Sequence, residues 1–218
     1  MENTLFIPEQ KTPYFTLPSH TVSWEQDRSH LENSLSPTEL ETFLKLYALS
    51  MKNPRLARKD VETFRERHPA QPEVLNLLTH LYLSCRKIGK ANRLIEENYS
   101  RNPDDLFAKI NFADLCLRRK KPQKIPAIFD GKSNLRQLYP DRKTFHISEF
   151  RGFTVLMGFY QLSLGNRGAA EGYHYLAERL DPDHPGTKLL EKKLYSVPFY
   201  KALGRKWRTV VRKKPPIT

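Results

Sequence analysis

The chain has 218 residues, of which 39% are hydrophobic and 28% are charged, as is typical of a soluble globular or helical-repeat protein. No run of 18 or more apolar residues occurs, which excludes a membrane-spanning helix, and the first residues do not resemble a secretory signal. Two cysteines, Cys85 and Cys116, make no disulfide framework, so we expect a cytoplasmic protein.

The formal net charge of +13 is concentrated near the carboxyl end. Residues 187–218 carry ten basic side chains against the single acid Glu191, so this segment holds +9 of the total. The rest of the chain is nearly balanced. This asymmetry predicts an anionic partner for the tail, whether nucleic acid, acidic lipid or acidic protein.

Residues 1–35 contain regularly placed prolines, Pro8, Pro13 and Pro18, and no helical period. Each proline favours extended geometry in the residue before it. The segment also carries apolar residues such as Trp24 and those of Tyr14–Leu17, which a fully solvated tail does not need. We therefore predict an extended arm over residues 1–35 that lies in a groove of this molecule or of another.

Helices are predicted from Ser36 onward. Ser36 can cap a helix, Pro37 suits its first position, and Glu39 can complete a capping box. Asn53 and Pro54 begin a second helix, which ends at His68. Further helices are expected over residues 72–86, 88–101, 104–120, 124–139, 148–164, 167–180, 185–195 and 198–213. The sequence thus predicts an all-α domain over residues 36–195, followed by a basic amphipathic segment over 196–218.

Small and helix-ending residues recur along this domain. Prolines stand near the ends of helix pairs at Pro69, Pro103, Pro140 and Pro182, and the second and third intervals are longer than the first. The number of residues between Ala57 and Ala91 equals that between Pro69 and Pro103. Likewise, the number of residues from Ala170 to Pro182 equals that from Ala57 to Pro69. The clearest unit also contains Gly158, Gly165 and Ala177. Recurrence at a period of about 34 residues indicates stacked helix pairs.

These residues resemble the tetratricopeptide repeat, a helix-turn-helix unit of about 34 residues, in about four degenerate copies over residues 37–183. The resemblance implies an α-solenoid of antiparallel helix pairs, a tetratricopeptide-like superhelix, with the extended arm at one end and a capping helix at the other. Residues 141–149 form an insertion, which we expect to kink the array between its third and fourth units.

Repeats of this family line a concave groove with their first helices, and the groove takes an extended peptide or a helix. The resemblance therefore implies a protein-binding groove whose predicted residues are Asn76, His80, Asn111, Asp114, Val155, Phe159 and Leu162. A clamp for a carboxyl terminus is rejected, because its lysines are missing. Residues 150–164 are apolar on all sides and must be covered, by the terminal helices, the arm, a second subunit or a client.

Three interpretations compete for residues 196–218: a helix that caps the last repeat, a nucleic-acid contact and a membrane-surface helix. We favour capping with an auxiliary anionic contact. Residues 118–121 form a second basic run that can extend the positive surface. The apolar side of the tail carries Phe199, Leu203, Trp207 and Val210, and its predicted anion-binding residues are Lys201, Arg205, Arg208, Arg212, Lys213 and Lys214.

Motifs for catalysis were also sought. The seven histidines form no metal-ligand pair, and no phosphate loop, nucleophile elbow or dinucleotide fingerprint occurs. We therefore expect no enzyme and no cofactor, but an adaptor, scaffold or chaperone that binds a protein or peptide client and can self-associate. The alternative is a nucleic-acid- or ribosome-associated protein that uses the basic tail.

Overall fold

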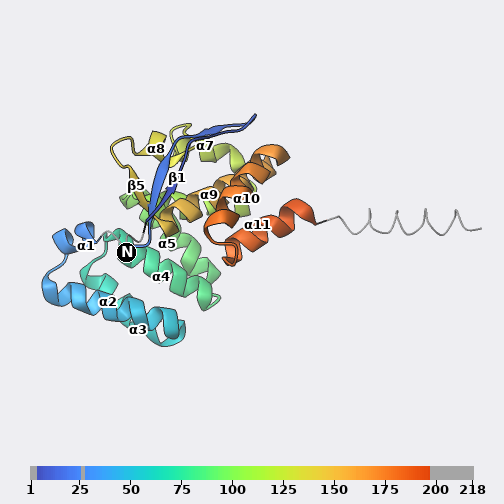
Figure 1. The fold of residues 1–218 in the computed structure, drawn as a ribbon. Coiled ribbons are helices and arrows are strands. Elements are labelled where there is room, and N and C mark those ends of the chain that lie inside the picture. Colours follow the sequence, from blue (N-terminus) through green and yellow to red (C-terminus); the bar gives the residue numbers. More distant parts are fainter. Residues whose placement is uncertain (1–3, 26–27, 197–218) are drawn as a thin grey trace, which may run out of the picture.

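The computed structural model describes residues 4–25 and 28–196 of the chain. Most of this part is helical, and the helices follow one another in a stack that starts at α2 and ends at α11 (Figure 1). The predicted helix over 198–213, and with it the proposed cap and anion-binding residues of the tail, lies outside the described residues. No helix in the described part is long and apolar enough to cross a membrane.

The long helices agree with the predicted ones to within a few residues. The predicted capping box is present: Ser36 Oγ accepts from Glu39 N at 3.4 Å, and the Glu39 carboxylate accepts from Ser36 N at 3.1 Å. Asn53 caps the helix that follows it, as expected, and Asp105, which was not among the predicted caps, caps the helix that follows it too. The helices are α1 (Ser29–Ser34), α2 (Pro37–Lys52), α3 (Pro54–Arg67), α4 (Pro72–Ser84), α5 (Ile88–Arg101), α6 (Leu106–Arg118), α9 (Ile147–Ser163), α10 (Arg167–Leu180) and α11 (Pro185–Tyr195).

The arm is a β-hairpin, which corrects the prediction of an all-α chain with an extended arm. Strands β1 (Thr4–Ile7) and β4 (His20–Ser23) pair antiparallel, as do β2 (Gln10–Lys11) and β3 (Thr16–Leu17) at the far end of the hairpin. Strand β5 (Thr144–His146) adds to β4 in parallel, with Val22 opposite Phe145. The predicted insertion at 141–149 therefore contains the partner of the arm.

The second prediction to be corrected is the helix over residues 124–139. This segment forms a short 3₁₀ turn, η1 (Pro122–Lys124), and two single-turn helices, α7 (Ile125–Ile128) and α8 (Leu135–Leu138). Asp130 and Gly131 both have positive φ angles, of 51° and 71°, so the helix cannot continue through them. The third pair consequently lacks a full second helix.

The helices pack in chain order. Within pairs, α2 packs on α3, α4 on α5 and α9 on α10; between pairs, α3 packs on α4, α5 on α6, α6 on α9, and α11 on both α9 and α10. The periodic alanines Ala57, Ala91 and Ala170 have no exposed surface. A methyl group added at Gly158 would overlap the buried side chain of Leu190. Small residues therefore occupy the places where helices approach closely.

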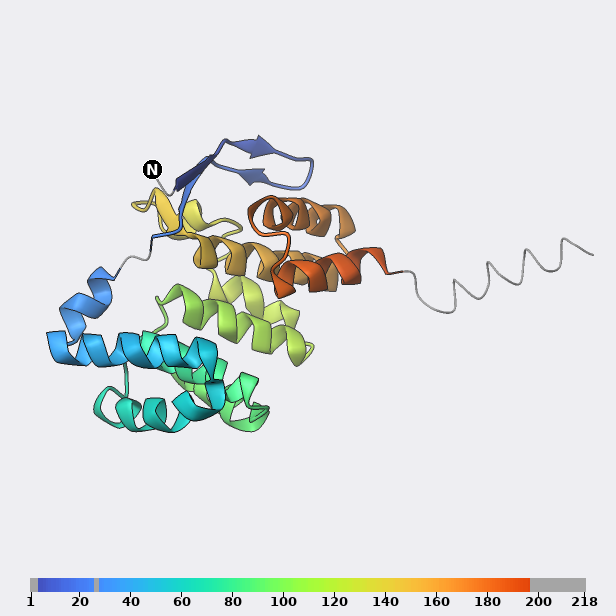
Figure 2. The ribbon, with the colours of Figure 1, turned by 60° about the horizontal axis from the view of Figure 1, so that its bottom comes forward.

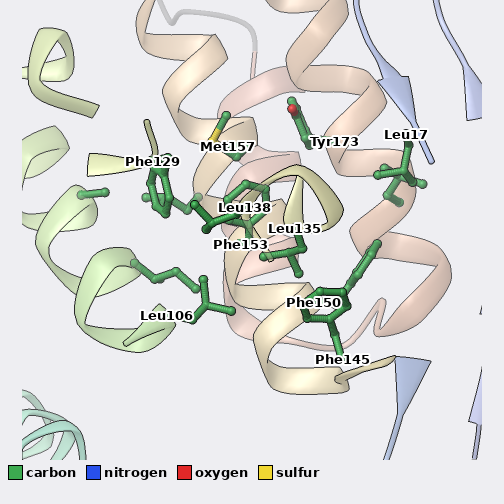
Figure 3. Packing of buried hydrophobic residues seen from close by; sticks show 14 of the residues in the cluster. Leu17, Leu106, Phe129, Leu135, Leu138, Phe145, Phe150, Phe153, Met157 and Tyr173 are labelled. Atoms are coloured by element: carbon green, nitrogen blue, oxygen red, sulfur yellow. The ribbon is translucent and has the colours of Figure 1, made fainter. Parts of the chain in front are cut away.

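Two apolar clusters stabilise the stack. The N-terminal core lies among α1–α5 and includes Phe43, Phe64 and Leu78. The C-terminal core joins the hairpin, α6–α10 and β5. In Figure 3, Leu17 of the hairpin and Phe145 of β5 lie toward the right, Phe129 lies on the left, and Phe153 lies near the middle of the cluster. The rings of Phe129 and Phe153 meet edge to face at 5.3 Å. Hairpin and helices are thus parts of one packed unit.

Candidate functional site

Helices α4 and α6, each the first helix of its pair, lie side by side and are joined by a network of side-chain amides. The Asn111 side chain donates to Asn76 Oδ1 at 3.1 Å, and Asn98, from α5, donates to the same oxygen at 2.9 Å. Asn76 in turn donates to Asp105 Oδ1 at 3.1 Å. The structure therefore brings the predicted residues Asn76 and Asn111 together, but both the oxygen and the amide nitrogen of Asn76 serve to join the second pair to the third.

Asp105 is the acidic end of this network. Its carboxylate accepts from the Ala108 backbone N–H at 2.7 Å and so caps α6. Burial raises the pKa of Asp105, while the Asn76 and Ala108 hydrogen bonds oppose that shift. The network thus joins the second helix pair to the third.

The predicted residues His80 and Asp114 lie one helical turn beyond this joint, and both are exposed. Asp114 accepts from Arg118 Nε at 2.8 Å, within its own helix. Of the described residues, none forms a hydrogen bond or ion pair with the His80 side chain. We call these two positions on adjacent helices the α4–α6 surface; it presents an imidazole ring and a carboxylate to solvent.

The three predicted groove residues on α9 lie in a different environment. Val155 is 9% exposed, and the half-buried Phe159 and Leu162 pack against Leu190 and Leu194 of α11. The seven predicted groove residues therefore divide into a polar set on α4 and α6 and an apolar set that α11 covers. A terminal helix was among the covers expected from the sequence, and α11 is such a cover. The predicted capping segment over 196–218 stays a prediction.

The tip of the hairpin lies against α10, the second helix of its pair, and not on the first helices. The rings of Tyr14 and Phe15 occupy the places where side chains at Gly168 and Gly172 would project. Phe15 also stacks on Tyr173, with ring centroids 4.4 Å apart and an interplanar angle of 13°. The four-residue spacing of Gly168 and Gly172 puts both on one helix face, and this was the signal that sequence reasoning missed.

A cavity of about 590 Å³ opens beside this contact, between the hairpin tip and the α9–α10 turn. Its lining is mainly uncharged; Arg167 is the one charged residue, and its guanidinium pairs with Glu171 at 2.9 Å. Tyr173 and Ser133 both line the cavity, and the Tyr173 hydroxyl donates to the Ser133 carbonyl at 2.9 Å. The lining residues of this cavity therefore offer no carboxylate, thiol or imidazole for acid–base chemistry.

The buried histidine His20 is held by contacts within the fold. His20, 1% exposed, donates from Nδ1 to the Pro18 carbonyl at 2.5 Å, and its ring meets Phe150 edge to face at 5.1 Å. Burial lowers the pKa of His20 most, and the nearby Arg136 lowers it further, against the Pro18 hydrogen bond. Residues 4–25 and 28–196 hold no group of three His, Cys, Asp or Glu side chains placed to bind a metal.

Comparison with known proteins does not extend these observations. The sequence matches no model of a known protein family. A search of curated proteins likewise gives no significant match.

Proposed function

We propose that the chain is a non-catalytic protein-binding module built from degenerate tetratricopeptide-like repeats, acting as an adaptor, scaffold or chaperone. The serial packing of α2–α6, the repeat spacing of the buried Ala57 and Ala91, and the cap provided by α11 support this proposal. Self-association through the apolar set on α9 is not part of it, because α11 already covers Phe159 and Leu162.

One observation carries the proposal: neighbouring first helices are locked together by Asn76 and Asn111, while the next turn of each helix presents an exposed polar side chain, His80 or Asp114. A rigid, paired surface of this kind suits an extended polypeptide, whose amides and basic side chains can reach the ring and the carboxylate. We therefore assign the client to the α4–α6 surface, and we expect it to carry a basic residue opposite Asp114.

Site-specific photocrosslinking tests this assignment. A photoreactive residue at position 80 should trap a client as a defined product, and Asp114→Lys should remove that product by repelling the basic residue of the client. Asp60→Lys makes the same charge change on the exposed outer side of α3 and should leave the product intact. Equal products from both charge variants, or none from the wild-type chain in the source cell, would contradict the proposal.

The alternative, a nucleic-acid- or ribosome-associated protein, depends on Lys201, Arg205 and the other tail cations. These residues lie outside the described part of the chain. The alternative therefore stays a prediction from sequence.

A further inference from the structure

The turns within helix pairs lie along one side of the stack, because α2, α4, α6 and α9 all run in the same direction (Figure 2). The helix α11 also runs this way, and the Arg167 guanidinium, from the α9–α10 turn, lies 5.7 Å from the centre of the Tyr195 ring at the end of α11. We call this side the turn edge; it comprises residues 51–56, 83–90, 118–124 and 163–167.

Charge separates the turn edge from the opposite side. The four segments of the turn edge contain eleven basic residues and no acidic one. By contrast, three of the connections between pairs, residues 68–73, 102–105 and 181–184, contain five acidic residues and no Lys or Arg, whereas the connection into α9, residues 139–146, contains Asp141, Arg142 and Lys143. The basic residues of the turn edge are Lys52, Arg55, Arg86, Lys87, Lys90, Arg118, Arg119, Lys120, Lys121, Lys124 and Arg167.

Most of these cations form no ion pair within the described residues, although Lys90 lies over the ring of Tyr82, with 5.7 Å between Nζ and the ring centre. Arg118, Arg119 and Arg167 pair with carboxylates of neighbouring helices or of their own helix. The other eight form no ion pair within the described part of the chain. A row of unpaired cations raises the local positive potential and favours an extended anionic partner.

Backbone conformation gives a second, independent indication. Arg86 and Lys120 occupy equivalent positions of successive repeats, just past the ends of α4 and α6, and both have a φ angle of 57°. Glycine is the residue least strained in this left-handed conformation, and the equivalent turn after α9 uses Gly165, with a φ angle of 80°. The chain thus places an exposed cation at two positions where its own folding would favour glycine.

Exposed aliphatic side chains accompany the cations. Met51, Leu56, Ile88 and Leu164 are between 47% and 64% exposed, and each lies in a segment of the turn edge. Cations alone suffice for a nucleic-acid backbone, which has no use for aliphatic side chains. An anionic membrane surface uses both kinds of residue, since lipid headgroups attract the cations and the underlying acyl region accepts the aliphatic side chains.

We propose that the turn edge docks this protein on an anionic membrane surface. The cations contact lipid headgroups, and Ile88, Leu164 and their aliphatic neighbours enter the interface beneath. Helix α11 ends at this edge, at Tyr195, and in the sequence it is followed by residues 197–218, which include seven basic residues and no acidic one. The α4–α6 surface of the proposed function adjoins this interface at Arg118, whose guanidinium pairs with Asp114.

Flotation of the full chain with lipid vesicles is the test. Vesicles with about 30% phosphatidylserine should carry the protein at about 0.1 M salt, and pure phosphatidylcholine vesicles should not. The double variant Arg86→Gly/Lys120→Gly should bind on the order of tenfold more weakly, yet unfold at a higher temperature because glycine relieves the strained turns. Lys59→Gln/Lys143→Gln, which removes two exposed cations elsewhere, should bind like wild type.

The aliphatic contribution separates a membrane from another polyanion. Ile88→Ser/Leu164→Ser should weaken vesicle binding without changing the charge, since less apolar area enters the interface. Three results would overturn the proposal: vesicle binding unchanged in both edge variants, binding independent of phosphatidylserine, or tight binding of single-stranded RNA that the serine variant leaves unaltered.

Discussion

The first two helix pairs and the region around the hairpin are stabilised by contacts of very different range. In the N-terminal core, Phe43, Phe64 and Leu78 belong to consecutive helices, so each contact joins residues close in sequence. In the C-terminal core, Ile7 and Leu17 pack with residues as distant as Tyr173. The first region is a succession of local units, whereas the second forms only when the hairpin returns to β5 and α10. The local periodicity of the sequence therefore predicts the structure of the first region well and that of the second poorly.

The largest effect that separates the two regions should come from Phe145→Ala. Phe145 is fully buried between the hairpin and α9, and Arg142 lies over its ring at 4.6 Å. Its removal should cost about 3–5 kcal/mol of unfolding free energy. It should also release the hairpin, seen as loss of amide hydrogen-exchange protection over β1 and β4.

Phe64→Ala is the matched change in the N-terminal core, where Phe64 is 1% exposed. The free energy of unfolding should fall by a similar amount. The hairpin amides should nevertheless keep their hydrogen-exchange protection at denaturant concentrations below the unfolding transition. Equal loss of hairpin protection in both variants would show that the two regions are not held independently.

A somewhat smaller effect should follow from Leu190→Ala in the capping helix. Leu190 has no exposed surface and packs over Phe159 and Leu162, so its truncation should cost about 2–5 kcal/mol and expose an apolar face. Dimers or larger species should then appear in sedimentation velocity. Leu189→Ala, at a neighbouring position that is 50% exposed, should leave the protein as the wild type; self-association of both variants alike would contradict the cap.

The smallest effect concerns pH, and the part of it that is due to His20 belongs to the hairpin region. The pKa of His20 is lowered in the folded chain, so the unfolded chain takes up a proton near its ordinary pKa of about 6.5 while the folded chain does not. The stabilisation is complete above that pH and is lost as pH falls from it toward the folded pKa. Urea unfolding between pH 7.5 and 5.5 should show a shallower pH dependence for His20→Phe than for wild type.

His184 contributes in the same direction, because burial lowers its pKa too. The wild-type slope therefore contains both histidines, and only the difference between the two chains reports on His20. Identical slopes would mean that the His20 ring is not buried in the hairpin region.

Much of the helical stack could be predicted from the sequence, and the reasons are local. The capping box at Ser36 and Glu39 and the prolines at helix starts act within one turn, and Ala57 and Ala91 report the spacing of whole pairs. The β4–β5 pairing joins segments that are far apart in the sequence, so no short-range sequence pattern predicts it. The break after α7 depends on the left-handed conformation of Asp130 and Gly131, which a lone glycine signals only weakly.

The candidate site was predictable in part for the same reasons. The resemblance named Asn76, Asn111, His80 and Asp114 as groove residues; the first two lie side by side and the other two lie on the next turn, while their role in binding stays a prediction. It did not show that the Asn76 and Asn111 side chains bind each other, nor that α11 covers Phe159. Those facts depend on how whole helices pack.

Close approach of helices at small residues is the central claim, and two glycines test it directly. Gly158 faces Leu190 and Tyr173 across a helix crossing, whereas Gly89, at the start of α5, has no atom near the place of a side chain. Equilibrium unfolding of Gly158→Leu and Gly89→Leu should give a loss of about 1–3 kcal/mol for the first and no loss for the second. Equal effects of the two substitutions would contradict the close packing on which the whole stack depends.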